Sequence, residues 1–302
     1  VIFGLKKVLL EGAELYQVQA RNPETQEKFG RGTPDDWMER KVYTRYRNYG
    51  ITGMFVLDLL LFGVPGIIVF AIQMLANPLM AAGVINGLGH YYGYRNFECP
   101  DAARNIVPWG LLVGGEELHN NHHAFPSSAK FSIHRWEFDM GWLYIRVFQV
   151  LRLARVIRIA PEPVRVAPRK HIDLEMVRAV IVNRMHVLRE YTRCVTLPVF
   201  REELRVAGGK LSSRVRKLLV REPVLLDNTA KSRLSEVLAS NQALRTVYEF
   251  RERLRVMWSG ANMSNEKLVQ YLKDWIAQAE ASRIKVLEDF AASLRGYAMQ
   301  PA

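Results

Sequence analysis

The feature that most constrains the fold of this chain is a long apolar tract between Arg47 and Arg95. Asp58 is the one Asp, Glu, Lys or Arg within it, and Leu, Ile, Val, Phe, Met, Gly and Ala dominate. A helix needs roughly 20 apolar residues to cross a bilayer, so the tract is long enough for two crossings. A Gly-Val-Pro-Gly sequence at residues 63–66 interrupts it. We therefore predict a membrane helical hairpin at about residues 50–92, with a buried hairpin of a soluble core as the alternative.

The segments on either side of this tract are polar or amphipathic. Residues 5–20 have the apolar spacing of a helix, interrupted by Gly12, and residues 21–48 indicate short helices and loops in water. Residues 146–158 interleave arginines with Val, Leu and Ile, which predicts an amphipathic helix on an anionic membrane face. The net charge is +12, and these positive flanks favour the cytoplasmic side of the membrane.

From about Pro168 onward the sequence is typical of a soluble helical region. Residues 228–258 have a helical apolar period after a capping residue, Asp227 or Asn228, and a second helix is expected over residues 265–281. We predict that these stripes form the core of a bundle; they contain Leu234, Val237, Leu238, Leu244, Val247, Leu254 and Met257, then Leu268, Leu272, Trp275 and Ile276. The expected fold class is all-α: a membrane hairpin with a cytosolic histidine cap, then a soluble helical C-terminal region.

Three of the seven histidines stand within the sequence GGEELHNNHHAFPSS, residues 114–128. On a helix, His119, His122 and His123 would lie within an arc of roughly 100°. Neutral imidazole suits zinc, iron, copper and nickel, so the spacing predicts a metal site without identifying the metal. The alternative is a group of packed or surface histidines. His134, His171 and His186 stand alone and are interpreted as ordinary residues.

His90 lies at the end of the apolar tract, where a membrane helix would meet the cytosol. An ionisable residue at that depth is a functional candidate. Asn86 precedes it by one helical turn and could bind metal through water or orient a ligand. Glu116, Asn120 and Asn121 could orient the imidazoles of the cluster, or they could be solvated or capping residues.

These motifs resemble those of a known family. NGLGHYYGYRNF, RNIVPWGLLVGGEELHNNHHAFPSSAKFS and RWEFDMGW are similar to sequences in membrane fatty acid desaturases of the stearoyl-CoA and bacterial Δ9 acyl-lipid type, and the likeness covers roughly residues 1–165. HNNHH resembles the third histidine box of that family. The resemblance implies that His119, His122, His123 and His90 are iron ligands and that Asn86 is bound through water. Glu116 and Trp136 also fall where the family has a Glu and a Trp.

The resemblance implies an oxidoreductase of fatty acid biosynthesis. In such an enzyme two iron ions, dioxygen and external electrons introduce a cis double bond, here at Δ9, into the saturated chain of an acyl-CoA or acyl-lipid. A separate ferredoxin, rubredoxin-like or cytochrome-type donor with its reductase is implied, because the sequence has no CxxCH motif and no iron–sulfur cysteine run. The expected location is the bacterial inner membrane, with membrane lipids as partners, no nucleic acid, and the histidines and C-terminal region in the cytosol.

The first two histidine boxes of the family have no counterpart here, since no histidine precedes His90. We therefore expect an N-terminally truncated desaturase, with a partial desaturase domain over residues 1–165 and a cytosolic helical extension over residues 166–302. Four imidazoles are too few for two irons, so the chain alone is expected to be inactive.

Two alternatives remain at the level of sequence. A related membrane diiron hydroxylase would share the fold and differ in its product. A basic nucleic-acid-binding protein is suggested by the charge of the helical region and by VYEFRERLRVMW, which resembles the C-terminal part of transposases. Zinc-finger spacing and aromatic–basic interleaving are absent from the sequence, and the long apolar tract is foreign to such proteins.

Overall fold

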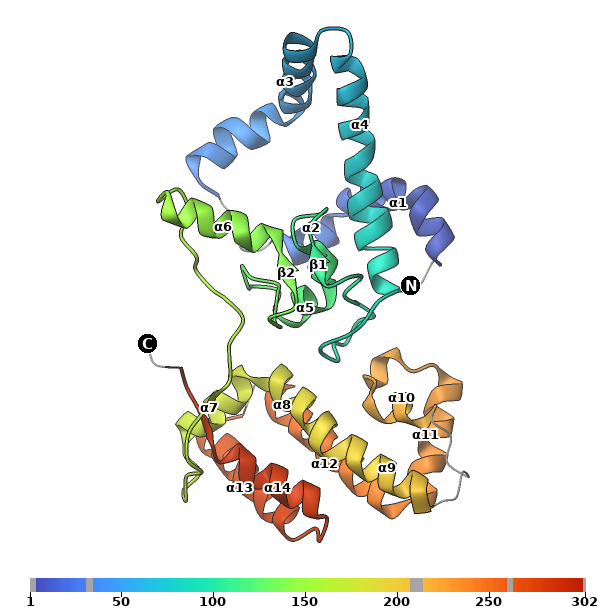
Figure 1. Cartoon of the computed structure of the whole chain (residues 1–302), viewed down its shortest axis with the longest axis vertical. Coiled ribbons are helices and arrows are strands. Elements are labelled where there is room, and N and C mark those ends of the chain that lie inside the picture. Colours follow the sequence, from blue (N-terminus) through green and yellow to red (C-terminus); the bar gives the residue numbers. More distant parts are fainter. Residues whose placement is uncertain (1–3, 31–34, 207–213, 260–262, 301–302) are drawn as a thin grey trace. The chain divides into compact units, whose positions relative to one another are not determined.

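The computed structural model describes residues 4–30, 35–206, 214–259 and 263–300. The chain is mostly helical, which confirms the all-α expectation at that level (Figure 1). It divides into two compact units, Val1–Gly93 and Tyr94–Ala302. Each unit is described by itself below. The division at residue 165 that the sequence suggests stays a prediction.

The first unit begins with α1 (Leu5–Ala20), which runs without a break through Gly12. The predicted interruption at Gly12 is therefore wrong. A Cβ at this position would lie 3.2 Å from Cβ of Ala82, so the glycine lets α1 approach the π-helical turn η2 (Leu79–Ile85) closely. The polar segment that follows contains α2 (Pro23–Phe29), capped by Asn22, and the π-helical turn η1 (Glu39–Tyr43).

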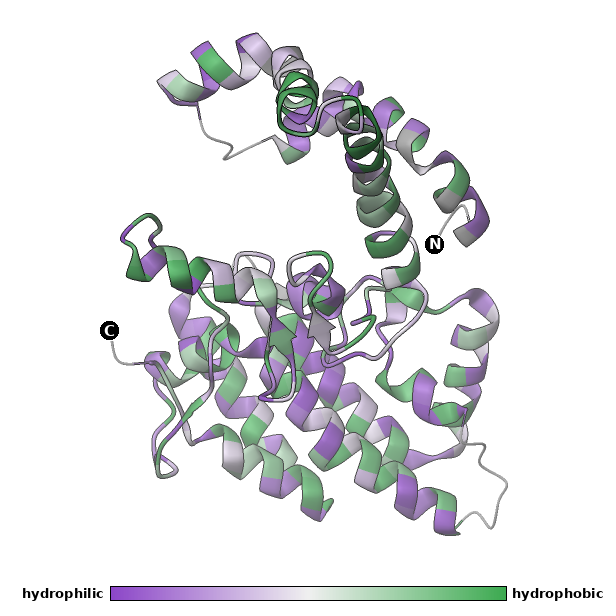
Figure 2. Ribbon diagram, turned by 45° about the horizontal axis from the view of Figure 1, so that its top comes forward, coloured by the Kyte–Doolittle hydropathy of each residue, from purple (hydrophilic) through white to green (hydrophobic). Residues whose placement is uncertain are grey.

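The apolar tract forms the later part of α3 (Thr44–Phe62) and the whole of α4 (Gly66–Pro78), and Figure 2 shows these two segments largely in the green of hydrophobic residues. Gly63 has a φ of +64° in the turn between them, and Phe55 contacts Phe70 edge to face at 5.1 Å. After α4 the chain continues through η2 into the 3₁₀ turn η3 (Leu88–His90). Gly66–His90 is long and apolar enough to cross a membrane, with a mean hydropathy of 1.9 over its most apolar 18 residues, whereas Tyr49–Phe62 is apolar but shorter. The predicted interruption at residues 63–66 is confirmed.

The second unit begins with residues 94–139, which consist mainly of loops and which we call the cap. Two short parallel strands, β1 (Trp109–Gly110) and β2 (Phe138–Asp139), flank the 3₁₀ turn η4 (Glu116–Leu118) and α5 (His119–Ala124) in sequence. Then α6 (Met140–Val150) starts at Asp139, whose carboxylate accepts a hydrogen bond from the backbone N–H of Trp142.

The helix predicted over residues 146–158 is wrong in its limits. Arg152 adopts a left-handed φ of +59°, and the N–H of Leu153 donates to the carbonyl of Phe148 at 2.8 Å. This is the Schellman ending of a helix. The helical spacing of the arginines continues in the sequence beyond the end of α6, but the backbone of residues 152–158 is irregular.

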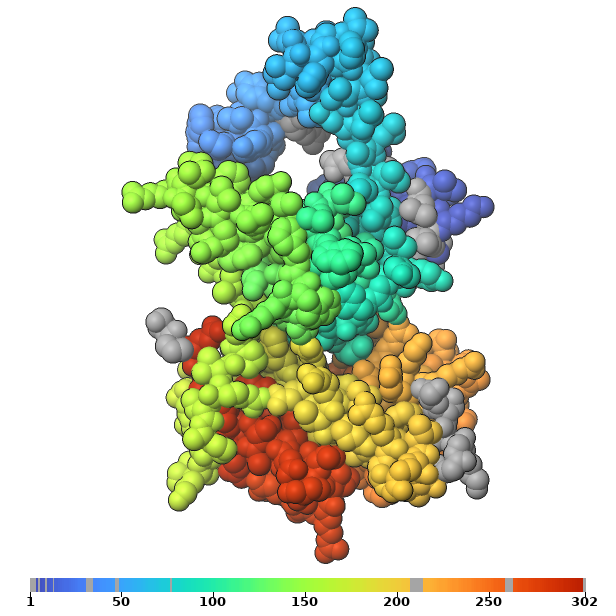
Figure 3. All heavy atoms as spheres, viewed as in Figure 1, coloured from blue at the N-terminus to red at the C-terminus, as the bar shows by residue number. Residues whose placement is uncertain are grey.

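The remainder of the second unit is a helical bundle closed by the antiparallel pair β3 (Val164–Arg165) and β4 (Tyr297–Ala298). Figure 3 shows the atoms of its early helices, in yellow, side by side with those of the last helices, in red. Its elements are α7 (Leu174–Val182), α8 (Arg184–Tyr191), η5 (Thr192–Thr196), α9 (Leu197–Val206), α10 (Val215–Val220), η6 (Pro223–Leu225), α11 (Asn228–Ser240), α12 (Gln242–Ser259), α13 (Asn265–Glu280) and α14 (Lys285–Leu294).

The predicted apolar stripes do form the bundle core. Its fully buried members include Leu244, Val247, Leu254, Leu272, Trp275 and Ile276, and Val237, Leu238 and Leu268 pack against it half-buried. Asp227 caps α11, as expected. The helix predicted over residues 228–258 is two helices, because Asn241 is extended and its Oδ1 accepts the N–H of Leu244. Asn241 is thus the N-cap of α12, and the apolar spacing alone did not reveal that a new helix starts there.

Candidate metal centre

The histidine helix α5 follows a tightly constrained turn. Gly114 and Gly115 have φ values of +63° and +100°, in the left-handed region that favours glycine. A Cβ on Gly115 would lie 2.5 Å from Oδ1 of Asp139. In the next turn, Oε1 of the buried Glu117 accepts the N–H groups of Leu112 and Val113 at 2.6 and 3.1 Å. These contacts fix where α5 starts.

The three imidazoles of α5 lie close together. The ring centroids of His119 and His123 are 4.4 Å apart, those of His122 and His123 are 5.6 Å apart, and those of His119 and His122 are 6.0 Å apart. The Nε2 atoms of His119 and His123 approach to 3.1 Å. Two ring nitrogens that converge in this way can act as ligands to a single cation.

Carboxylates contact the other ring nitrogen of these two histidines. Oδ2 of Asp101 is 2.8 Å from Nδ1 of His123, and Oε2 of Glu116 is 3.5 Å from Nδ1 of His119. A histidine that binds metal through Nε2 commonly donates its Nδ1–H to a carboxylate, which fixes the tautomer. The nearby ring of His119 lowers the pKa of Glu116, and partial burial opposes this effect. The donor set therefore fits a cation that accepts imidazole nitrogen.

The surroundings of His122 favour its neutral form. Its Nδ1 is buried without a hydrogen-bond partner among the described residues. Burial lowers the pKa of His122, and the nearby His123 and His119 lower it further against the opposing effect of Glu116. The neutral imidazole, which is the form that binds metal, is therefore favoured.

Asn120 and Asn121 anchor α5 to a loop at residues 96–105. Oδ1 of Asn120 accepts the N–H groups of Asn96 and Phe97 at 2.8 and 2.9 Å, and its Nδ2 donates to the carbonyls of Phe97 and Ala103. Asn121 bonds to Asn96, Asn105 and Glu137. These amides position the helix backbone, and through it the imidazoles.

Several residues of this network were not identified from the sequence. Asp101 stands 22 positions before its partner His123, so no local spacing connects them. Glu137 is buried and accepts hydrogen bonds from the Tyr94 hydroxyl, the Asn96 amide and the backbone N–H groups of Ile133 and His134. Its position among aromatic residues in RWEFDMGW was the one available signal of a buried, functional carboxylate.

The other predicted residues lie in different settings. In the first unit, His90 ends η3 and is half-buried, and the side chain of Asn86 donates to the carbonyl of Ala81 at 2.8 Å. Their participation in a metal site with α5 stays a prediction. In the second unit, Trp136 is exposed and stacks on His134 at 5.3 Å.

The bundle contacts the cap through α8. The ring of His186 lies 5.2 Å from Phe97 and 5.3 Å from Phe125, and Phe97 contacts Phe125 at 5.1 Å. Nη2 of Arg189 lies 2.9 Å from Nε2 of His134. We call these five residues the α8 seam. It supports the loop that holds Asn120.

Comparison with known proteins gives two different relationships. Residues 156–300, just under half of the chain, match a family model described as a transposase. The Delta-9 desaturase-like 5 protein of Arabidopsis thaliana is 39% identical over 79 residues, 26% of each chain. The sn-2 palmitoyl-lipid 9-desaturase of Nostoc sp. (strain 36) is 39% identical over 77 residues, 26% of this chain and 27% of the relative.

The sn-1 stearoyl-lipid 9-desaturase of Synechocystis sp. is 40% identical over 78 residues, 26% of this chain and 24% of the relative. The chain thus spans about a quarter of the length of the curated relatives it matches. No solved structure matches. About a quarter of the chain is therefore related to the Δ9 desaturases, which suggests an oxidoreductase.

Proposed function

We propose that this chain supplies part of the iron-binding region of a Δ9-type fatty acyl desaturase. The observation that carries the proposal is the convergence of the His119 and His123 Nε2 atoms at 3.1 Å, with a carboxylate at each Nδ1. The relationship of a quarter of the chain to Δ9 desaturases supports the same conclusion.

His119, His122 and His123 would bind iron from α5. By the resemblance to desaturases, His90 would be a fourth ligand and Asn86 would act through water. Removal of hydrogen from unactivated carbons needs a strong oxidant, because side-chain acids and bases cannot do it. Two bound irons would supply this oxidising chemistry, with dioxygen as the co-substrate. Asp101 and Glu116 would hold the Nδ1 protons of their histidines and so aim Nε2 at the metal. Four imidazoles are too few for two irons, so a complete centre would need ligands from outside these residues.

The membrane setting belongs to the same proposal. We propose that α3 and α4, with its continuation to His90, form a membrane hairpin and that the cap faces the bacterial cytosol. The substrate would be a saturated fatty acyl-CoA or acyl-lipid. Electrons would come from a separate ferredoxin, rubredoxin-like or cytochrome-type protein. The apolar Gly66–His90 segment and the basic charge of the chain support this arrangement.

Titration of the full chain in detergent with Co²⁺ tests the metal site, because the visible spectrum of Co²⁺ reports ligand binding. We expect saturable binding that weakens at least tenfold in His123→Ala and His119→Ala, about 1.4 kcal/mol or more. His171→Ala removes an exposed histidine of the bundle and is the matched control. His90→Ala tests the fourth ligand. Equal Co²⁺ affinity in the wild type and both α5 variants would refute the proposal.

The transposase match favours a second candidate, a DNA-processing function of residues 156–300. Such chemistry commonly uses carboxylates that hold two metal ions. Several acidic side chains of this region instead pair with arginines: Glu222 with Arg251 and Arg255, and Glu280 with Arg295. Gel-shift titration of the full chain with duplex DNA at two salt concentrations tests this candidate. Tight, salt-dependent binding would support it.

A further inference from the structure

An arginine-lined pocket lies in the second unit, apart from the α5 histidines. Its volume is about 380 Å³. Five cationic side chains and one carboxylate line it, together with one hydroxyl and two apolar residues. The lining consists of Arg95, Glu98, Arg104, Thr192, Leu197, Arg216, Lys217, Val220 and Arg221, and we call it the arginine pocket.

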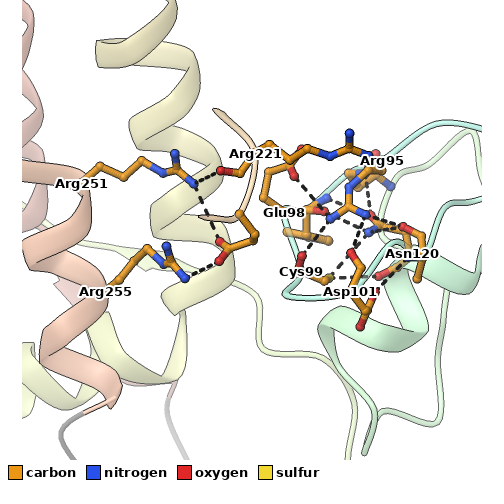
Figure 4. A network of polar contacts seen from close by, with 12 residues as sticks. Arg95, Glu98, Cys99, Asp101, Asn120, Arg221, Arg251 and Arg255 are labelled. Atoms are coloured by element: carbon orange, nitrogen blue, oxygen red, sulfur yellow. Dashed lines mark hydrogen bonds and ion pairs between the residues drawn. The ribbon is translucent and has the colours of Figure 1, made fainter. Parts of the chain in front are cut away.

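The pocket is assembled from segments far apart in the sequence. Arg95 and Arg104 belong to the loop region that holds α5, whereas Arg216, Lys217 and Arg221 come from α10 and the residue that ends it. Figure 4 shows Arg95, Glu98 and Arg221 near one another, between the cap and the bundle helix that carries Arg251 and Arg255. Folding of the second unit is therefore what creates this concentration of charge.

The cations of the arginine pocket are held together against their mutual repulsion. Arg95 is fixed because its guanidinium donates to the carbonyls of Cys99, Asp101 and Ala103. Burial lowers the pKa of Arg104, and the neighbouring charges of Arg221 and Arg95 lower it further. A nearby anion would relieve this repulsion.

The described residues supply little negative charge to balance the cations of the arginine pocket. Glu98 contacts Arg95 at 3.3 Å, but burial raises the pKa of its carboxyl group. The neighbouring buried Glu222 pairs with Arg251 and Arg255, outside the pocket. Within the described residues, no carboxylate lies within ion-pairing distance of Arg216 or Lys217.

We propose that the arginine pocket binds a phosphate-bearing small molecule, with a phosphate or diphosphate group held by Arg104, Arg216, Lys217 and Arg221. Guanidinium groups bind phosphate oxygens in pairs with defined geometry, and the hydroxyl of Thr192 offers another donor. Leu197 and Val220 provide apolar contact for the remainder of the ligand. The proposal is independent of the proposed metal centre.

The dimensions of the pocket favour a small ligand over a polymer. Its volume falls in the range of small-molecule sites, roughly 300–1,000 Å³. A nucleic acid backbone instead needs a basic groove that follows successive phosphates. The phosphate could belong to a soluble molecule or to a lipid headgroup, and these two sources share the same recognition chemistry.

Isothermal titration of the full chain in neutral detergent with inorganic pyrophosphate tests the proposal. We expect saturable binding at one site that weakens at least tenfold in the double variant Arg216→Ala, Lys217→Ala. Both residues are exposed on α10, and alanine keeps the helix. Arg178→Ala with Lys273→Ala removes the same charge from exposed positions elsewhere in the bundle and is the matched control, with an expected change of less than twofold. Non-saturable binding, or equal losses in both double variants, would overturn the proposal.

Competition experiments identify the source of the phosphate. Displacement of pyrophosphate by vesicles containing phosphatidic acid, but not by phosphatidylcholine vesicles, supports a lipid headgroup. Displacement by a soluble nucleoside diphosphate, with no effect of either vesicle, supports a soluble ligand. Displacement by duplex DNA that strengthens with DNA length would contradict a small-molecule site. Loss of pyrophosphate binding with intact Co²⁺ binding leaves the metal proposal untouched, because the two sites share no residue.

Discussion

Asn120 is the side chain that ties the histidine helix to the rest of the cap. It is fully buried, and its amide makes four hydrogen bonds to backbone groups of residues 96–103. The sequence left open whether Asn120 orients the imidazoles or is a solvated or capping residue, because its partners stand 17 to 24 positions away. Metal binding by the α5 histidines could be predicted from their local spacing. The hydrogen bonds that hold α5 in place could be identified only in the folded chain.

Asn120→Ala leaves these buried backbone groups without partners. We expect a loss of about 2–4 kcal/mol in local stability, since each unsatisfied buried group costs about 1–3 kcal/mol. Hydrogen exchange measured by mass spectrometry should show faster exchange of the amides of Asn96 and Phe97. Asn228→Ala, at an exposed position in α11, is the control and should not alter them. Unchanged protection in Asn120→Ala would show that the network is dispensable.

His186 makes the α8 seam sensitive to acid. Burial lowers its pKa from 6.5 to about 4, with Arg189 and His134 contributing and a backbone hydrogen bond to Pro161 opposing. Between pH 6.5 and 4 the unfolded chain binds the proton and the folded chain does not, so stability is complete above pH 6.5 and is lost as the pH falls toward 4. The expected loss from pH 7 to pH 5 is about 2 kcal/mol.

His186→Phe should remove that part of the pH dependence while it keeps the ring contacts with Phe97 and Phe125. Thermal unfolding of the wild type and the variant at pH 7 and pH 5 measures the difference. The exposed His171, replaced by Phe, controls for the general effect of losing a histidine. Direct observation by NMR that His186 titrates near pH 6.5 would contradict the expected desolvation.

At the level of elements, the sequence predicts where helices exist better than where they end. The helices within residues 228–258 and 265–281 were identified from their apolar period, since burial of one face is the main signal that a helix leaves in its sequence. Three predicted breaks or ends of helices were wrong, each because of a single residue. Gly12 provides a close approach, Arg152 takes a left-handed conformation, and Asn241 caps a new helix. Such features depend on single residues, so periodicity does not detect them.

The glycine pair before α5 offers a matched test of how tightly that element is held. Gly114 and Gly115 both have positive φ, which costs about 1–2 kcal/mol for alanine. A Cβ on Gly115 would also press on Oδ1 of Asp139, whereas Gly114 has open space. Gly115→Ala should therefore be more destabilising than Gly114→Ala by about 1–3 kcal/mol. Denaturant unfolding of both variants measures this difference, and equal losses would contradict the role of Asp139.

At the scale of the whole molecule, contacts within the second unit connect residues that stand far apart in the sequence. Residues 94–302 form one compact unit by their contacts, and the division near residue 165 that the family resemblance suggests stays a prediction. The seam residues of α8 carry no motif, and His134 and His186 were interpreted as ordinary residues. No local signal connects them, because His134 and its partner Arg189 stand 55 positions apart.

Arg189→Ala tests whether the bundle supports the cap. The change removes the hydrogen bond to His134 and the stacking of the guanidinium near Phe97, at 5.7 Å. We expect a loss of about 1.5–3 kcal/mol, typical of a charged hydrogen bond. Hydrogen exchange should accelerate both in residues 94–105 and in α8. Arg233→Ala, at an exposed position in α11, should change neither region. Acceleration confined to α8 would argue against coupling.

The small β3–β4 pair has a consequence for how the helical bundle is connected to the rest of the chain. Val164 pairs with Ala298, and the side chain of Gln300 donates to the carbonyl of Glu162. The two ends of the helical bundle therefore lie close together. The segment that resembles a transposase family, residues 156–300, begins and ends near this pair. A region whose two ends meet can be acquired or exchanged by recombination without rerouting its neighbour. The β3–β4 pair therefore brings both ends of the helical bundle to one small junction.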